Sequence, residues 1–216
     1  MRKTSRWSQF VSLMAGQLAG RSSLRDIESN MKAQAQRLYH LGATPVARSS
    51  LARLNEQQPY TLYETLFNKL YARCQRLAPG HRFRFKNKLY ALDASLIDLS
   101  LKIFPWAHYA LGKAAMKLHV GLDHAGYLPA FATVTEGKTS DIEVGRMLDF
   151  PRGSIVVFDK DYTDYKWFKH MTDRGIFFVT RIRKNAIWRV EARHPVDRRT
   201  GVTSDQLITL TGVKSQ

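Results

Sequence analysis

The chain has 216 residues, an ordinary apolar content of 44%, a single cysteine and a formal net charge of +16. This length allows one sizeable domain or two small ones, and the composition argues against a disordered chain and excludes a disulfide framework or a thiolate metal cage. The charge is not a basic tail, because residues 1–80 and residues 81–216 each carry an excess of +8. It favours a large polyanion that contacts both halves, with solubility alone as the alternative explanation.

Nothing in the sequence predicts a membrane protein. No apolar run approaches the roughly 20 residues that are needed to cross a bilayer. The apolar residues after the N-terminus resemble a signal peptide only faintly, because Ser8, Gln9, Ser12 and Gln17 interrupt them. We therefore expect a cytoplasmic protein without a membrane partner.

Residues 1–80 predict a small all-helical domain. From the spacing of apolar residues we expect helices over residues 7–18, 24–38, 50–58 and 61–77. A helix, a turn and a short helix with Arg48 and Arg53 nearby are typical of a helix-turn-helix DNA reader. A small bundle whose arginines are simply solvated explains the same pattern equally well.

After Pro79–Gly80 the apolar period changes from helical to alternating, and this predicts a domain boundary near residue 80. From Lys88 we expect the order strand, strand, strand, helix, strand, helix, strand. An antiparallel meander followed by a crossover into parallel strands is the ribonuclease-H-like arrangement of an α/β protein. Beyond Arg181, two weakly alternating stretches, 187–192 and 207–210, are typical of the start of a β-rich insertion.

Two aspartates follow apolar runs of the strand type. Asp93 follows Leu89–Leu92 at the expected end of the first strand, and Asp159 follows Ile155–Phe158 at the end of the fourth. These strands are neighbours in a ribonuclease-H-like sheet, so the carboxylates can converge although they are far apart in sequence. For either aspartate alone a turn or cap role is the usual explanation.

Converging carboxylates would hold two divalent ions about 3.5–4 Å apart, one activating a water or a DNA 3′-hydroxyl and one stabilising the leaving oxygen of a phosphodiester. Mg²⁺ is favoured because the ligands are oxygen atoms only, with Mn²⁺ as an alternative. Asp161 competes with Asp159 as a ligand. Asp159 is the better candidate because it directly follows the apolar run.

The second expected strand carries polar residues that face away from its apolar side. Lys113, Lys117 and His119 lie on this polar side and are candidate phosphate contacts, although a solvated strand face explains them about as well. Asp98, Asp123 and Asp141 are expected to be turn and cap residues.

Several long segments resemble the catalytic domain of DDE transposases from bacterial insertion sequences, of the insertion-sequence-four group. They are LYALDASLIDLSLKIFPWA (89–107), KLHVGLDHAGYLPAF (117–131), GKTSD (137–141), IVVFDKDYTDYKWF (155–168) and FFVTRIRKN (177–185). The segments LAGRSSLRDIE (18–28) and LGATPVARSSLAR (41–53) resemble the helical domain that precedes it.

The resemblance implies a cut-and-paste enzyme that nicks transposon ends and joins them to target DNA. Its first two catalytic and metal-binding acids fall on Asp93 and Asp159, with two Mg²⁺ ions in the complete enzyme. The implied partner is double-stranded DNA at the transposon ends and the target. The resemblance also allows a homodimer in the synaptic complex and a nucleoid location when DNA is bound.

The sequence departs from the family pattern in two places. Asp161 stands where such proteins have a glycine, which suggests a backbone conformation that aspartate tolerates only moderately. The family's third acid, a glutamate in a Tyr–Arg–Glu–Lys-like signature after the β-rich insertion, has no match after residue 181, and Glu191 lies in a strand-like stretch instead. We therefore expect a C-terminally truncated transposase that is inactive by itself.

Two other functions remain open from the sequence. One is a catalytically inactive DNA-binding product that competes for the ends of an intact element, which predicts salt-sensitive binding without cleavage. The other is a stand-alone metal-dependent nuclease of the same fold, which needs a third acid from the β-rich segment.

Overall fold

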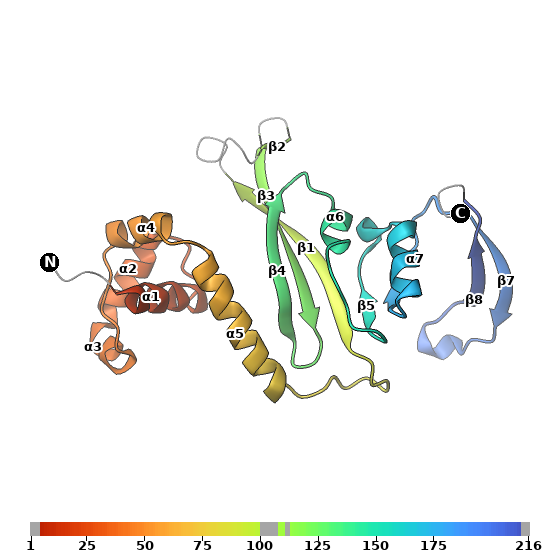
Figure 1. Ribbon diagram of the computed structural model, residues 1–216, viewed down its shortest axis with the longest axis horizontal. Helices are drawn as coiled ribbons and strands as arrows, with labels where there is room; N and C mark the ends of the chain where they lie inside the picture. Colours follow the sequence, from red (N-terminus) through yellow and green to blue (C-terminus); the bar gives the residue numbers. More distant parts are fainter. Residues whose placement is uncertain (1–4, 100–107, 111–112, 213–216) are drawn as a thin grey trace. The chain divides into compact units, whose positions relative to one another are not determined.

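The computed structural model describes residues 5–99, 108–110 and 113–212. The chain divides into two compact units, Met1–Asn68 and Lys69–Gln216 (Figure 1). The division falls within helix α5 (Thr61–Leu77), whereas the sequence places the change of periodicity near residue 80. The sequence predicts the class correctly: helices come first and a mixed α/β sheet follows.

The first unit is built from short helices around a small apolar core. Its elements are α1 (Arg6–Leu18), α2 (Leu24–Ala33), α3 (Ala35–Leu38), η1 (Tyr39–Leu41), α4 (Arg48–Gln57) and the start of α5. Ser5 and Ser23 cap α1 and α2 by accepting backbone N–H groups of the first turn. The single helix expected over 24–38 is wrong, because Gln34 leaves the helical conformation and separates α2 from α3.

The core of this unit consists of buried apolar side chains from α1 to α4 and from the loop before α4: Val11, Ile27, Met31, Leu38, Ala43, Val46 and Leu51. Gly16 is required where α1 meets α2, because a Cβ atom there would lie 2.6 Å from the Cδ1 atom of Ile27. The close approach of the two helices therefore depends on the absence of a side chain at this position.

The second unit contains the mixed sheet. Its strands are β1 (Leu89–Leu99), β2 (His108–Ala110), β3 (Lys113–Asp123), β4 (Leu128–Glu136), β5 (Ile155–Val157) and β6 (Phe177–Val179). Among the described residues the order is β2-β3-β1-β5-β6, with β4 paired to β3. The antiparallel β1–β3–β4 meander and the parallel β1–β5–β6 set confirm the predicted order, while the short strand β2 was not predicted.

Two helices and a 3-10 turn connect the later strands: α6 (Asp141–Gly145), η3 (Lys160–Tyr162) and α7 (Tyr165–Asp173). A capping box of Ser140 and Glu143 opens α6. Asp164 caps α7 by accepting the backbone N–H of Trp167. These connections hold their strands through one apolar core, which consists of Tyr90, Leu92, Phe150, Val156, Phe158, Tyr162, Trp167, Met171 and Ile176.

Strands β7 (Trp188–His194) and β8 (Asp205–Leu210) form a separate antiparallel pair after the main sheet (Figure 1). Asp197 begins the turn η4 (Arg198–Thr200) between them, and Gly201 follows with a φ of 82°. These strands coincide closely with the weakly alternating stretches in the sequence. None of the described helices is long and apolar enough to cross a membrane.

The core beneath β5 predicts the effect of a matched pair of substitutions. Met171 is 2% exposed and packs in this core, whereas Met147 is 81% exposed. We expect Met171→Ala to lower the free energy of unfolding by about 2–5 kcal/mol, because the methionine leaves a cavity, and Met147→Ala to change it by less than about 0.5 kcal/mol. Urea denaturation followed by circular dichroism measures both, and equal effects would contradict the assigned core.

Candidate functional site

The candidate site is centred on the parallel pairing of β1 with β5. Leu89 pairs with Ile155, Tyr90 with Val156 and Ala91 with Val157, so each residue lies opposite the one 66 positions later. Asp93 and Asp159 are separated by the same interval. Asp159 follows β5 in an extended conformation, with φ −82° and ψ 176°. Continuing the same offset two residues beyond the last pair would set Asp159 opposite Asp93.

Both aspartates lie on the same face of the sheet. Tyr90 and Leu92 of β1, like Val156 and Phe158 of the β5 segment, point into the core beneath α7. Because side chains alternate along a strand, Asp93 and Asp159 take the opposite face. Neighbouring strands are about 5 Å apart, which is close enough for carboxylates in register to share an ion.

The position of Asp93 within its strand differs from the prediction. The sequence places it at the strand's end, but β1 continues to Leu99 because it pairs with β3 along its whole length, as far as Leu99 opposite Ala114. Asp93 is thus held inside the paired part of the strand, opposite Val120 of β3. A carboxylate inside a paired strand is positioned more firmly than one at a free end.

Each carboxylate has one oxygen that no described residue engages. Asp93 Oδ1 accepts the backbone N–H of Ala94 at 2.8 Å, and Asp159 Oδ1 accepts that of Asp161 at 2.8 Å. The Oδ2 atoms make no hydrogen bond to another described residue, which leaves oxygen ligands of the kind that Mg²⁺ prefers. The described residues contain no group of three or more acidic, histidine or cysteine side chains that could hold a metal. The pair therefore fits part of a metal site.

Asp161 occupies the turn η3 immediately after Asp159. Its φ is not positive, so the backbone at this position does not require glycine. The strained conformation that the sequence comparison suggested is therefore absent. The backbone N–H of Asp161 instead orients the Asp159 carboxylate, while the Asp159 carbonyl accepts a hydrogen bond from the Thr180 hydroxyl at 3.1 Å.

Tyr162 is a buried neighbour of this site that the sequence analysis did not single out as functional. Burial raises the pKa of its phenol well above the ordinary value, and the charges of Asp141, Asp93 and Asp159 raise it further. These three carboxylates therefore lie within electrostatic range of one hydroxyl group. Tyr162 lies in a segment of apolar and aromatic residues, so the sequence gives no sign that it lies close to these carboxylates.

Lys117, His119 and Asp141 form a polar cluster under the other face of the sheet. The Lys117 ammonium lies 2.9 Å from Asp141 Oδ1 and donates to the Thr139 carbonyl at 2.8 Å. His119 is completely buried, with Nε2 2.9 Å from Thr135 Oγ1 and Nδ1 3.8 Å from Asp141. Burial lowers the pKa of His119, with Lys117 acting in the same direction and Asp141 opposing it, so the ring is neutral at neutral pH.

This cluster changes the interpretation of the second strand. His119 is completely buried and Lys117 is only partly exposed, so the polar side of β3 is not a solvated face and His119 has no surface that DNA could reach. Lys117 forms an ion pair with Asp141. Asp141, which was expected to be only a turn or cap residue, therefore also neutralises this lysine. Lys113 opens β3, and its side chain lies outside the described part. Arg48 and Arg53 are exposed on α4 of the first unit.

Comparison with known proteins identifies the family. Residues 84–210 match the family described as a transposase DDE domain, and residues 1–44 match a domain of unknown function, DUF4372. The first match covers more than half of the chain, which therefore belongs to the DDE transposases of insertion sequences. The mixed sheet is consistent with the ribonuclease-H-like sheet of such enzymes, and the predicted family is confirmed.

Two relatives carry the name of transposase. The protein y4zB of Sinorhizobium fredii (strain NBRC 101917 / NGR234) is 28% identical over 135 residues, which are 62% of this chain and 37% of that protein. The transposase named for insertion sequence element IS5377 of Geobacillus stearothermophilus is 26% identical over 137 residues, 63% of this chain and 36% of its own length. The chain thus spans little more than a third of these relatives.

One solved structure, the cryo-EM structure of a simian T-cell lymphotropic virus intasome in complex with the PP2A regulatory subunit B56 gamma, is similar over 56% of this chain and 40% of its own. The identity is 19% and the TM-score is 0.31. A similarity of this size supports no argument about fold or function.

The environment of Tyr162 predicts a pH effect on stability. Its raised pKa means that the folded chain keeps a proton that the unfolded chain releases above the ordinary value of 10.0. The contribution of this retained proton to the free energy of unfolding is fully present below the ordinary pKa of tyrosine. It is lost as the pH rises toward the pKa of Tyr162 in the folded chain. Above the ordinary pKa of tyrosine, we expect the midpoint temperature of thermal unfolding to fall more steeply with pH in wild type than in Tyr162→Phe. The control Tyr60→Phe, at a 75% exposed side chain, keeps the wild-type slope; a wild-type slope in Tyr162→Phe would contradict the assignment.

Proposed function

We propose that residues 84–210 contribute to metal-dependent cleavage of transposon-end DNA and its strand transfer to a target. Asp93 and Asp159 act as the metal-binding and catalytic carboxylates. The observation that supports this proposal is the register of β1 and β5, because its offset of 66 residues equals the sequence separation of Asp93 and Asp159. Membership of the DDE transposase family supports the same reaction class.

Mg²⁺, with Mn²⁺ as an alternative, is the cofactor that this pair would hold, with two ions in a complete enzyme. Bound ions would supply an activated oxygen nucleophile and charge stabilisation at the phosphodiester. The chain's own residues keep the ligands in place. Strand pairing fixes Asp93, while the Asp161 N–H fixes the Asp159 carboxylate and the Thr180 hydroxyl fixes its carbonyl.

Double-stranded DNA is the proposed partner, and transposon ends and target would both be bound in a synaptic complex built from a homodimer. The helical unit would contribute Arg48 and Arg53, which are exposed on α4. On β3, Lys113 remains a candidate phosphate contact. The strand pair β7–β8 is proposed to be the start of a β-rich insertion in a ribonuclease-H-like domain.

A second candidate function is DNA binding without cleavage. It is favoured by the absence of a third acid next to Asp93 and Asp159 among the described residues. Glu191 is a poor candidate for that acid, because its carboxylate is already paired: its Oε1 atom lies 2.9 Å from the Arg189 guanidinium. The stand-alone nuclease, which needs such an acid from β7–β8, is correspondingly less well supported. Residues 1–216 alone would then bind DNA and fail to cut it.

Metal binding tests the central claim independently of cleavage. In NMR spectra, Mn²⁺ should broaden the amide signals around Asp93 and Asp159 by paramagnetic relaxation. Removing a residue that only hydrogen-bonds to a metal ligand weakens metal binding about 10–100-fold. We therefore expect Asp93→Asn or Asp159→Asn, which removes a direct ligand, to weaken metal binding by at least this much. Asp98→Asn, an exposed aspartate further along β1, is the matched control.

The outcomes separate the candidate functions. Saturable Mn²⁺ broadening that only the Asp93 and Asp159 variants lose supports the metal site, and Mg²⁺-dependent nicking of duplex DNA would then identify an active enzyme. Metal binding and DNA binding without nicking would identify the second candidate. Broadening that persists in Asp93→Asn and Asp159→Asn would overturn the proposed site.

A further inference from the structure

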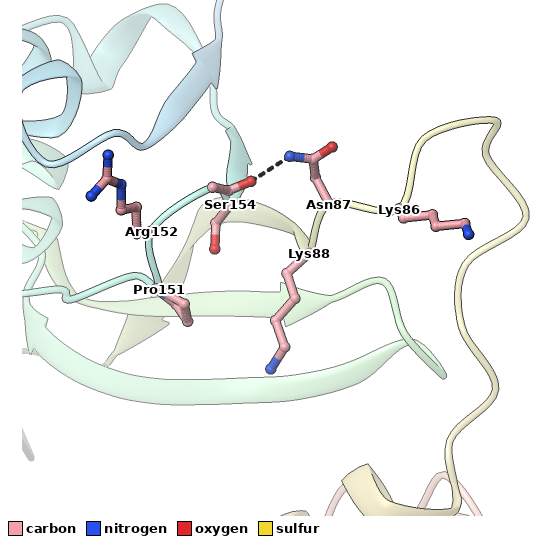
Figure 2. A pocket seen from close by; sticks show the side chains of 7 residues that line it. Lys86, Asn87, Lys88, Pro151, Arg152 and Ser154 are labelled. Atoms are coloured by element: carbon pink, nitrogen blue, oxygen red, sulfur yellow. Dashed lines mark hydrogen bonds between the residues drawn. The ribbon is translucent and has the colours of Figure 1, made fainter.

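A basic pocket lies where β1 and β5 begin. It is open, has a volume of about 410 Å³ and is lined by Lys86, Asn87, Lys88, Pro151, Arg152, Gly153 and Ser154 (Figure 2). Its lining carries cations and contains no carboxylate. Lys88 also lines a neighbouring pocket that includes Asp123, but it forms no ion pair with that residue.

Backbone hydrogen bonds hold this pocket in a fixed shape. The Lys88 carbonyl accepts the N–H of Ile155 at 2.8 Å, and the Asn87 side chain donates to the Gly153 carbonyl at 2.6 Å. Gly153 has a φ of 81° and donates its N–H to the carbonyl of Gly175 at 2.8 Å. The lining is therefore part of the β1–β5–β6 pairing, and its geometry is set by the sheet.

No described residue neutralises the cations of this pocket. Lys86, Lys88 and Arg152 are exposed and form no ion pair with a described residue. Other cations of the same unit are already paired, such as Lys138 with Glu136 and Lys169 with Asp173. An uncompensated group of cations at a fixed surface attracts anions.

Ser154 adds an independent sign of a ligand. Its side chain is 1% exposed, and its hydroxyl has no hydrogen-bond partner among the described residues although it lines the pocket. A buried polar group without a partner costs free energy unless a ligand or water satisfies it. A phosphate oxygen at the pocket would accept a hydrogen bond from this hydroxyl.

The segment that leads into the pocket continues the positive charge. Arg82 and Arg84 alternate with Phe83 and Phe85, whose rings stack on each other at 5.4 Å between centroids. The ring of His81 also contacts Phe85 at 4.9 Å. The aromatic side chains thus pack together, while both arginines are exposed and form no ion pair with a described residue.

The arrangement of the cations selects the kind of anion. In Figure 2, Arg152 and Lys86 extend to opposite sides of Ser154, and Lys88 extends in a third direction. Cations that diverge in this way do not enclose one small ion, but they can contact successive phosphates of an extended polyanion. We propose that Lys86, Lys88, Arg152 and Ser154, here called the basic patch, bind the phosphodiester backbone of DNA.

The basic patch is distinct from the aspartate pair but lies within reach of the same duplex. Leu89 and Asp93 are four residues apart on β1, which corresponds to about 13 Å along the strand. A single DNA strand advances about 3.4 Å per phosphate, so this interval matches about four nucleotides. The inference rests on the proposed function in one respect, namely that DNA is the ligand.

The test compares two charge-matched triple variants of the full chain by fluorescence anisotropy on a labelled duplex in EDTA at several NaCl concentrations. The first variant is Lys86→Gln/Lys88→Gln/Arg152→Gln. The control is Lys138→Gln/Lys169→Gln/Arg199→Gln, in which each lost cation is already paired with an acid. Circular dichroism verifies that both variants fold.

We expect the patch variant to bind at least about tenfold more weakly than the control, with the slope of log K against log salt reduced by about 2–3, since each phosphate contact contributes about 0.9. Ser154→Ala should weaken binding several-fold without changing the slope, because the hydroxyl carries no charge. Inorganic phosphate should give no saturable NMR shift at the Gly153 and Ser154 amides.

Equal loss of affinity in the patch and control variants would overturn the inference, as would saturable binding of inorganic phosphate with unchanged DNA affinity. No DNA binding by wild type would overturn it together with the proposed function. If the patch variant binds DNA as tightly as the control variant and still nicks DNA with Mg²⁺, the inference about the basic patch is refuted and the proposed function is not. Patch-dependent DNA binding without Mn²⁺ binding at Asp93 and Asp159 would refute the metal site alone.

Discussion

The parallel pairing of β1 with β5 is the constraint on which the candidate chemistry depends. One register places Tyr90 and Val156 in the core, and Asp93 and Asp159, which are separated by the same offset of 66 residues, follow it on the other face. A slip of one residue would turn a whole row of side chains to the opposite face and bury a carboxylate. The apolar core beneath α7 therefore enforces the register that the aspartate pair requires.

The two faces of this sheet are stabilised in different ways. One face is closed by aromatic and aliphatic side chains, including Trp167 and Met171, and by the buried cluster of Lys117, His119 and Asp141. The face that carries the aspartates is more open, with Val157, Phe177 and Val179 at least partly exposed. Function at the open face thus depends on packing at the closed one, because buried side chains determine how the strands align.

Charge is also distributed along the sheet in a definite order. Unpaired cations lie where β1 and β5 begin, and the carboxylates come several residues later on the same strands. A polyanion attracted to the cations would be repelled by bare carboxylates, and divalent ions would remove that repulsion. The net charge of +16 is therefore less informative than the separation of paired cations from unpaired ones.

The sequence by itself determined the helical first part, the strand order and the family, because apolar periodicity and long motif segments are local properties. It also selected Asp93 and Asp159 through the apolar runs that precede them. Only the tertiary structure decided that Asp93 lies within a strand, that His119 on the polar side of β3 is buried, and that Tyr162 lies near three carboxylates. It likewise joined Lys86–Lys88 to Pro151–Ser154 in one pocket. These properties arise from contacts between distant segments, and no local pattern in the sequence records which segments will meet.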